Sequence, residues 1–431
     1  MSAGLLGSLL GVGAGLAVLV VALFLARRAP RVAVVLALAT VCFVPVWLGV
    51  NLGFNGNLFL PAAVLVCLGV AVVLLPVRGF RLSAVDGLLA FLLTLAASSL
   101  LTSEPTLAMS FLITPFTYFV AGYALGRIAT ARLGAEFVYR AIAILFTVVA
   151  LLVIIEFFSG FNPFIGLHTD SALFAQWGDI QQRGGYARAE GAFGHSIALG
   201  SSLALAVPLT LASSLRFPLR LAMTITMLAA TVVTFSRIGI ICAFLGVLLA
   251  AVLLRGQLST VHRAGLVVGG GVIALAMLPL VTAVFTDAGE EAQASAAYRG
   301  DLFPLVSQAN LVGFSDVVSR STDGSLRFGG FRSIDSQLVL TGMTTGLLAL
   351  VAVAIAVAIA ITLCLRRRAE PATIAIVAQL PALATVALIT QYSVMLWLVI
   401  GIAATTQLAA RARVVSFPYL TDPVLTPTPG D

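Results

Sequence analysis

The sequence contains no lysine, and only 10% of its 431 residues are charged. All 24 cations are therefore arginine, a bias that codon usage in a GC-rich genome explains. So few charges exclude a water-soluble domain of this size. Nucleic-acid binding is also disfavoured, because the arginines fall in short clusters between apolar runs, where membrane topology already accounts for them.

Cysteine is scarce as well. Four are present, all inside apolar segments, namely Cys42, Cys67, Cys242 and Cys364. Their spacing fits neither a metal site nor a disulfide framework, so we interpret them as small core residues. The sequence also lacks a P-loop, an Asp-x-Asp motif and a histidine cluster. We therefore expect no metal and no nucleotide cofactor.

Hydrophobic residues, by contrast, make up 60% of the chain, and the mean hydropathy is +1.11. This composition predicts an all-α, polytopic integral membrane protein with one membrane domain over residues 1–413. Apolar runs of helix length predict about thirteen transmembrane helices, at residues 4–26, 32–50, 58–76, 85–101, 106–125, 141–158, 197–215, 221–235, 238–254, 264–285, 338–363, 372–390 and 392–410.

The first run does not resemble a secretory signal peptide, because no cation precedes it and Arg27, Arg28 and Arg31 follow it. We expect it to be retained. With these arginines in the cytoplasm, alternate connections carry the remaining arginine clusters inside, as the positive-inside rule requires. They are residues 78–81, 127–140, 216–220, 255–263, 366–368 and 411–413.

This frame predicts a protein of the cytoplasmic membrane with its amino terminus outside and its carboxyl terminus inside. The Pro-rich tail, residues 414–431, is expected to be cytoplasmic and disordered. The frame depends on a helix break at Ser236–Arg237. One continuous helix there would invert everything downstream and place the arginines of 366–368 outside.

Two extracytoplasmic loops are predicted to be long, residues 159–196 and 286–336, and long loops on an economical membrane protein are usually functional. The orientation bias does not explain the arginines predicted to lie outside, so we expect them to have a partner. They are Arg183, Arg188, Arg237, Arg299, Arg320, Arg327 and Arg332.

The first loop ends in a glycine-rich segment around Arg188, directly before a helix begins at Ser196. Glycines let a ligand approach the backbone, and a helix amino terminus attracts an anion. Alternatively, Arg188 pairs with Glu190 or Asp179 and only ties the loop down. His195 lies beside these arginines, as a substrate contact or as a structural imidazole. Arg237 contacts a substrate or merely snorkels to the interface.

In the second loop, the spacing of Leu302, Phe303, Val306 and Leu311 predicts an interfacial amphipathic helix with Asp301 as its cap. Farther on, Arg332 precedes Asp335 at the start of the next helix. Simple solubilising charge remains the alternative for most of the polar residues of this loop.

Four patches resemble the O-antigen ligase and Wzy-type polysaccharide polymerase family of bacterial membrane glycosyltransferases. They are residues 188–196 (RAEGAFGHS), residues 234–239 (TFSRIG), Arg299 with Leu302 and Gly313, and residues 335–338 (DSQL) followed by Gly342 and Gly346. The similarity spans about residues 80–410 and rests on the order of short motifs. Many members have Pro-Asn at Ser196-Ile197, and the ligases have His at Asp335, which favours a polymerase or another polysaccharide transferase.

The resemblance implies transfer from a glycan on polyprenyl pyrophosphate at the outer membrane face, without metal or nucleotide. It implies catalytic roles for Asp335, Arg188 and Arg299. Guanidinium groups would bind the diphosphate and stabilise its departure, while Asp335 would orient or deprotonate the acceptor hydroxyl. Further substrate contacts are expected from Arg237, Arg183, His195 and Arg332. Expected partners are the lipid-linked glycan, membrane lipids and other envelope polysaccharide assembly proteins.

Two other classes stay open. A transporter or lipid-linked glycan flippase would also suit thirteen helices, although such proteins usually place ionisable groups near the bilayer midplane. In this sequence Glu156 and Asp86 stand near the ends of their apolar runs, not at the centres. A noncatalytic assembly scaffold is the third class.

Overall fold

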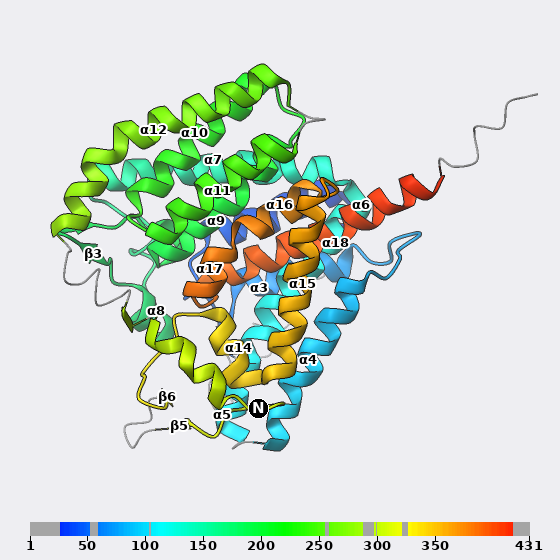
Figure 1. The fold of residues 1–431 in the computed structure, drawn as a ribbon, viewed down its shortest axis with the longest axis vertical. Helices are drawn as coiled ribbons and strands as arrows, with labels where there is room; N and C mark the ends of the chain where they lie inside the picture. The colour runs from blue at the N-terminus through cyan, green and yellow to red at the C-terminus, as the bar shows by residue number, and fades with distance from the viewer. Residues whose placement is uncertain are drawn as a thin grey trace, which may run out of the picture.

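The computed structural model describes residues 26–51, 59–102, 105–254, 258–287, 297–298, 300–320 and 326–416, and its fold is mostly helical (Figure 1). The helices are α2 (Pro30–Phe43), α3 (Ala62–Val73), α4 (Ala84–Thr102), α5 (Pro105–Thr114), the π-helical η1 (Pro115–Phe119), α6 (Val120–Leu133), α7 (Ala135–Ser159), α8 (Ala172–Trp177), the 3₁₀-helical η2 (Gly191–Phe193), α9 (Ser196–Leu211), α10 (Phe217–Val233), α11 (Arg237–Leu253), α12 (Thr260–Asp287), the 3₁₀-helical η3 (Phe303–Gln308), α14 (Gln337–Thr345), α15 (Leu347–Leu365), α16 (Pro371–Ala378), α17 (Leu380–Thr385) and α18 (Thr390–Ser416). Three two-stranded antiparallel sheets join β1 (Gly49–Asn51) to β2 (Phe59–Pro61), β3 (Gln182–Arg183) to β4 (Tyr186–Ala187), and β5 (Val318–Arg320) to β6 (Leu326–Phe328).

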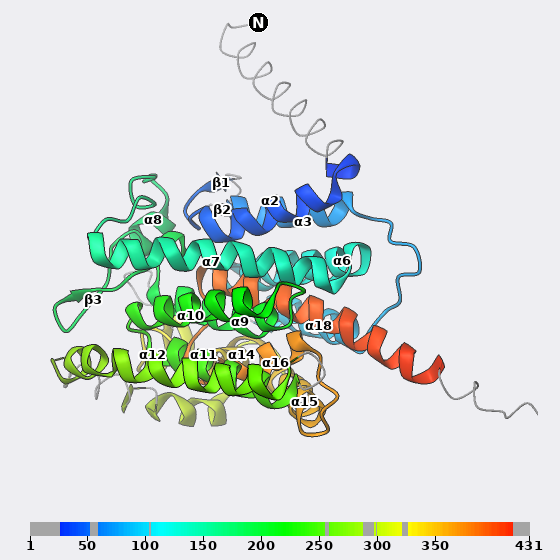
Figure 2. The ribbon, with the colours of Figure 1, turned by 90° about the horizontal axis from the view of Figure 1, so that it is seen from above.

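The helices stack in layers around α9, which is buried along nearly its whole length. Seen from above, α2 and α3 lie on one side and α11, α12 and α15 on the other, with α7, α9 and α18 between them (Figure 2). The tightest pair is α6 with α18. Its closeness depends on glycine, since a Cβ at Gly126 or Gly401 would collide with the backbone of the facing helix.

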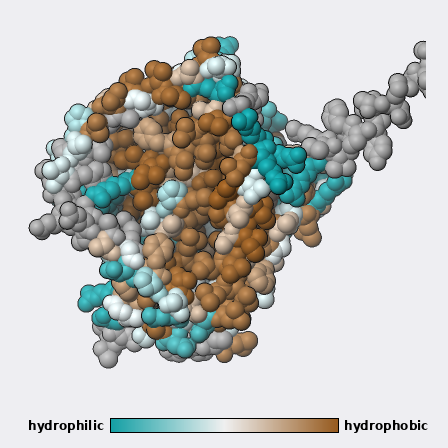
Figure 3. All heavy atoms as spheres, viewed as in Figure 1, coloured by the Kyte–Doolittle hydropathy of each residue, from teal (hydrophilic) through white to brown (hydrophobic). Residues whose placement is uncertain are grey.

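The outer surface has the character of a membrane protein. Five helices among the described residues are long and apolar enough to span a bilayer. They contain Ala84–Leu101, Phe111–Leu133, Ala135–Ser159, Leu347–Leu365 and Thr390–Ala412. Apolar residues form a broad area across the face in Figure 3, with hydrophilic residues at its upper right and lower margins. On α15 the exposed side chains include Val351, Ile355 and Ile359. A continuous apolar stripe of this kind is rare on the surface of a water-soluble protein.

Each predicted run that the structure describes contains a helix, but thirteen spans are not confirmed, because only five of the described helices are long and apolar enough, and several runs need correction. The run 32–50 is helical only to Phe43 and ends in β1, and the run 58–76 begins in β2, so that α3 has only 12 residues. The run 338–363 is two helices, because the chain turns at Gly346, whose φ of +101° favours glycine. A Cβ there would also lie 2.7 Å from the carbonyl oxygen of Leu311. The run 372–390 is likewise divided into α16 and α17, with Pro381 in the first turn of α17. The run 4–26 and the tail from residue 417 lie outside the described residues.

The break at Ser236–Arg237 is confirmed. Helix α10 ends at Val233, α11 begins at Arg237, and the Ser236 hydroxyl caps α11 by accepting a hydrogen bond from the Gly239 amide. The two helices run in opposite directions along α9, because α10 passes from Met227 beside Thr210 to Thr234 beside Gly200, while α11 passes from Gly239 beside Gly200 to Gly246 beside Pro208.

One end of the bundle, which we call the loop end, gathers the helix termini next to the first long loop and the described part of the second long loop, whose strands β5 and β6 lie below α8 in Figure 1. In Figure 1, β3 and α8 mark it at the left and lower left. Side chains connect the loop to the helices there. The bonds are Trp47 Nε1 to Leu167 O, Arg188 Nε to Thr234 O, Arg183 Nη1 to Phe235 O and Gln391 Nε2 to Ala192 O.

The opposite end, which we call the arginine end, gathers the connections predicted to be cytoplasmic. The contacts that join them are Arg132 Nη1 to Leu74 O, the Arg127–Asp86 ion pair, Gln407 Nε2 to Arg368 O, Arg31 over the Phe137 ring, and the stacked rings of Phe217 and His262. The helix ends that the arginine pattern grouped together therefore contact one another in the structure.

The second long loop has a small hydrophobic core of its own, which packs on α5 and α14. Leu302, Leu305, Phe314 and Phe328 are buried in it. A helix is present at the predicted place, but its start is not where the sequence placed it: residues 300–302 are already helical and lead directly into η3, so Asp301 stands within the helix and not at its cap. Its apolar residues are divided: Leu302 and Leu305 are buried in this core, whereas Phe303 and Leu311 are exposed. The hydroxyl of Ser307 and the amide of Ala309 bond backbone carbonyls within this turn.

Candidate functional site

The first loop is shaped by a glycine hairpin. Strands β3 and β4 pair Arg183 with Tyr186, leaving Gly184 and Gly185 as a two-residue turn with φ of 53° and 76°. Positive φ at both turn residues suits glycine and matches the twist of a hairpin. The hairpin places Arg183 beside the α10–α11 turn.

Two arginines bond the backbone of that turn. Arg188 is buried, and its Nε donates to Thr234 O at 3.1 Å while Nη1 donates to Gln181 Oε1 at 3.0 Å. Arg183 Nη1 donates to Phe235 O at 3.0 Å. The last carbonyls of a helix lack intrahelical partners and carry partial negative charge, so guanidinium groups stabilise the end of α10. Arg188 thus ties the loop down, through these bonds to the turn and to Gln181.

A network of two buried acids, Glu156 and Glu190, lies next to these arginines, and the sequence analysis did not predict that the two acids meet. Glu156, in the last turn of α7, accepts hydrogen bonds from the amides of Glu190 and Gly191 at 3.0 and 2.9 Å. Asn162 Nδ2 donates to the same carboxyl group at 2.9 Å. Its sequence signal was a carboxylate at the end of an apolar run, which is rare unless partners satisfy it.

Glu190 is also buried, and the Gln181 amide donates to its Oε1 at 3.3 Å. Burial raises the pKa of Glu190 to about 8, against the opposing effects of that hydrogen bond and of the charge on Arg188. Below that pH the side chain is mostly protonated. Glu190 itself therefore adds little negative charge next to the arginines of the loop at neutral pH.

His195 caps α9. Its Nδ1 accepts a hydrogen bond from the Ile197 amide at 3.1 Å, which requires that nitrogen to be unprotonated. Burial, together with the positive charges of Arg188 and Arg183, lowers the pKa of His195 to about 3. The imidazole is neutral at physiological pH, and the structural role foreseen as an alternative is present.

The TFSRIG turn at residues 234–239 has a packing explanation for most of its residues. Ser236 caps α11, and Gly239 packs against Gly200 of α9 so closely that a Cβ would lie 3.0 Å from the Gly200 backbone. Arg237 occupies the first helical position and is partly exposed. Its guanidinium lies at the helix end where anions are favoured.

The second loop forms an open hollow of about 760 Å³. Its lining includes Tyr298, Arg327, Arg332 and Asp335. The Tyr298 hydroxyl donates to Ser333 O at 2.6 Å and so connects the two edges of the loop. Arg332 is exposed and Asp335 partly exposed, so both are accessible to a ligand.

The alternative that Asp335 caps the following helix is wrong. Ser336 is the cap of α14, and its Oγ accepts from the Val339 amide at 3.3 Å. Helix capping therefore does not account for Asp335, whose carboxylate lines the hollow.

The predicted site residues fall into two groups. Arg183, Arg188 and His195 lie together in the first loop, with Arg237 beside them. Arg332 and Asp335 lie in the hollow of the second loop, where Arg327 joins them. Helix α17 packs against both α11 and α14, and so stands between the two groups. Arg299 lies outside the described residues.

Within the residues that the structure describes, no group of three or more His, Cys, Asp and Glu side chains is arranged to hold a metal ion. Comparisons of the chain with known protein families, with curated proteins and with solved structures find no match.

Proposed function

We propose that this chain is a multipass glycosyltransferase of the cytoplasmic membrane, which transfers glycan from a polyprenyl diphosphate donor to a hydroxyl acceptor at the outer face. The observation that carries the proposal is the hollow of the second loop, where Arg327 and Arg332 stand with Asp335. Two guanidinium groups suit a diphosphate, and a neighbouring carboxylate suits a hydroxyl.

The proposed topology has thirteen membrane crossings, with the amino terminus outside and the carboxyl terminus inside. Its support is the sorting of helix ends described above: connections rich in arginine meet at the arginine end, and the long loops extend from the other. Under the positive-inside rule the arginine end faces the cytoplasm. The loop end then faces outward, where a lipid-anchored donor presents its diphosphate and sugars.

In the proposed reaction the bond between the anomeric carbon and the diphosphate oxygen breaks, and a bond from the acceptor oxygen to that carbon forms. Polyprenyl diphosphate leaves with the electron pair. Arg327 and Arg332 stabilise the charge that develops on it. Asp335 orients the acceptor hydroxyl and receives its proton late, as the carbon becomes strongly electrophilic.

In this proposal the residues of the first loop position the site. Arg188 and Arg183, bonded to the α10–α11 turn, act as positioning residues, and His195 fixes the start of α9. We retain Arg237 as a donor contact because it is partly exposed at a helix amino terminus. Arg299 remains a candidate for the same role because it follows Tyr298, which lines the hollow.

The test is a reconstituted reaction. Purified protein in liposomes receives a polyprenyl diphosphate-linked glycan and a hydroxyl acceptor, and the products are separated by mass. Release of polyprenyl diphosphate together with a lengthened glycan is expected. Movement of the intact donor across the bilayer without cleavage would instead identify a flippase. If folded protein neither transfers the glycan nor moves the donor, an assembly scaffold becomes the better interpretation.

A further inference from the structure

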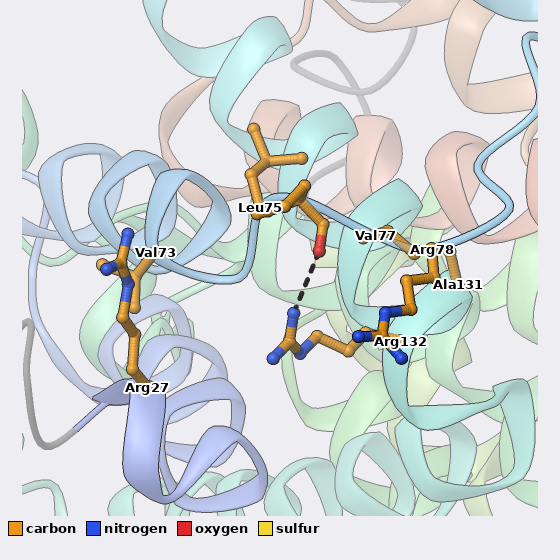
Figure 4. A pocket seen from close by; sticks show the side chains of 8 residues that line it. Arg27, Val73, Leu75, Val77, Arg78, Ala131 and Arg132 are labelled. Atoms are coloured by element: carbon orange, nitrogen blue, oxygen red, sulfur yellow. Dashed lines mark hydrogen bonds between the residues drawn. The ribbon is translucent and has the colours of Figure 1, made fainter.

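A second basic pocket lies at the arginine end, far from the proposed catalytic hollow. It has a volume of about 600 Å³, and three of its lining residues are Arg27, Arg78 and Arg132 (Figure 4). Arg27 reaches in from one wall, while Arg78 and Arg132 come from the other. No acidic side chain lines this pocket in the described part of the chain.

One of these arginines is held in position. Arg132 Nη1 donates to Leu74 O at 2.7 Å and to Pro76 O at 3.3 Å, which joins the end of α6 to the end of α3. Its position is therefore set by the fold before a ligand arrives, and the ordering cost of binding is reduced.

The rest of the pocket wall is apolar and continues onto exposed apolar surface. Val73, Leu75 and Val77 line the pocket, and Leu75 is exposed. Leu65 and Val72, both exposed on α3, are seven residues apart and so lie on one face of that helix. A cationic pocket that opens onto an apolar face matches a molecule with an anionic head and hydrocarbon chains.

We propose that this pocket binds the phosphate headgroup of an anionic phospholipid, with Arg27, Arg78 and Arg132 around the phosphate and the acyl chains along α3. Free inorganic phosphate shares the anionic chemistry but would gain nothing from the apolar face. In the proposed orientation the headgroup belongs to the cytoplasmic leaflet. Neither this site nor its test depends on glycan transfer.

Lipid binding to the full-length protein, purified in a neutral detergent, tests the proposal. Phosphatidylglycerol and phosphatidylcholine are titrated separately, and bound lipid is counted by native mass spectrometry. The protein should prefer phosphatidylglycerol, and the double variant Arg27→Gln with Arg78→Gln should lose about tenfold or more of that affinity. Both side chains are exposed, so the fold should be kept.

The matched control is Arg366→Gln with Arg411→Gln, which removes the same charge from exposed positions of the same end outside the pocket. It should change the affinity less than about twofold. If both double variants lose the same affinity for phosphatidylglycerol, the effect comes from general surface charge and the proposal is overturned. Displacement of the lipid by millimolar inorganic phosphate would overturn it too, because the site would then be one for the free anion.

Discussion

The two ends of the helix bundle use arginine differently. At the arginine end, the sequence predicts cations from the positive-inside rule, and one of them, Arg127, is buried in an ion pair with Asp86 at 3.0 Å. At the loop end, the proposed orientation leaves the cations unexplained by that rule. There Arg188 and Arg183 bond backbone carbonyls, while Arg327 and Arg332 line an open hollow. Charge at the first end holds helices together and is what the proposed topology rests on, whereas charge at the second end has to be explained by a ligand or by the loop's own structure.

The largest effect is expected from breaking the ion pair at the arginine end. Asp86→Ala leaves the buried Arg127 without its carboxylate, which should cost about 3–5 kcal/mol of stability. Thr405 Oγ1 still accepts from Arg127 Nη1 at 3.0 Å, but a hydroxyl does not neutralise charge. The melting temperature in detergent should fall steeply, while transfer per folded molecule stays unchanged. A variant that folds normally but has lost transfer would contradict the division of roles between the ends.

The next effect is on catalysis at the loop end. Asp335→Asn should lower the transfer rate by about 10²–10⁴-fold, the usual contribution of a positioned acid–base group. The melting temperature and binding of the lipid-linked donor should not change, because Ser336 rather than Asp335 caps α14.

Ser336→Ala is the matched control for Asp335→Asn. It removes the cap and should cost about 1 kcal/mol of stability, yet leave the transfer rate of folded protein within about twofold. Full activity of purified Asp335→Asn would remove Asp335 from the proposed mechanism.

Arg188→Gln should cost about 2–3 kcal/mol, because charged hydrogen bonds to Thr234 O and Gln181 Oε1 are lost. Arg183→Gln should cost less, because Arg183 is only partly buried and its bond to Phe235 O is therefore less protected from water than the bonds of Arg188. Limited proteolysis within residues 160–195 reports on the loop itself. If Arg188→Gln leaves both melting and proteolysis unchanged but abolishes donor binding, Arg188 contacts the substrate directly and the positioning role is wrong.

A smaller effect concerns pH. Glutamate in an unfolded chain titrates near 4.3, whereas burial raises the pKa of Glu190 to about 8 in the fold. Between those values the unfolded chain has released a proton that the folded chain keeps, so stability should fall as pH rises from about 5 to 8.

Glu190→Gln tests this dependence, because the amide oxygen can still accept from the Gln181 amide. The melting temperature of the variant, measured from pH 5 to 8, should decline less than that of the wild type. Parallel curves for the two proteins would show that Glu190 is charged throughout, contrary to its described environment.

Most of the helices and the grouping of their ends could be predicted from the sequence, because the length of an apolar run and the placement of arginines are local signals. The break at Ser236–Arg237 was found that way. The division of the run 338–363 was missed, because a glycine within an apolar run does not by itself predict a turn. What requires Gly346 is the approach of Leu311, a contact between distant segments.

The candidate site was only partly accessible to sequence reasoning for the same reason. The arginines of the first loop were identified, but their acceptors are backbone carbonyls of Thr234 and Phe235, which no sequence pattern marks. The exclusion of Asp335 from the cap of α14 also needed the geometry, because Asp335 and Ser336 are both good cap residues.

The most direct test of the account is the sidedness of the two ends, because the proposed donor site requires the loop end to face outward. Cysteine is introduced at exposed positions, as Ala172→Cys and Ser333→Cys at the loop end and Arg366→Cys at the arginine end. The four native cysteines are buried and should give little background. An impermeant thiol reagent applied to intact cells should label positions 172 and 333, and should label position 366 only after permeabilisation. Labelling of position 366 in intact cells, with 172 and 333 protected, would place the hollow in the cytoplasm and contradict the proposed function.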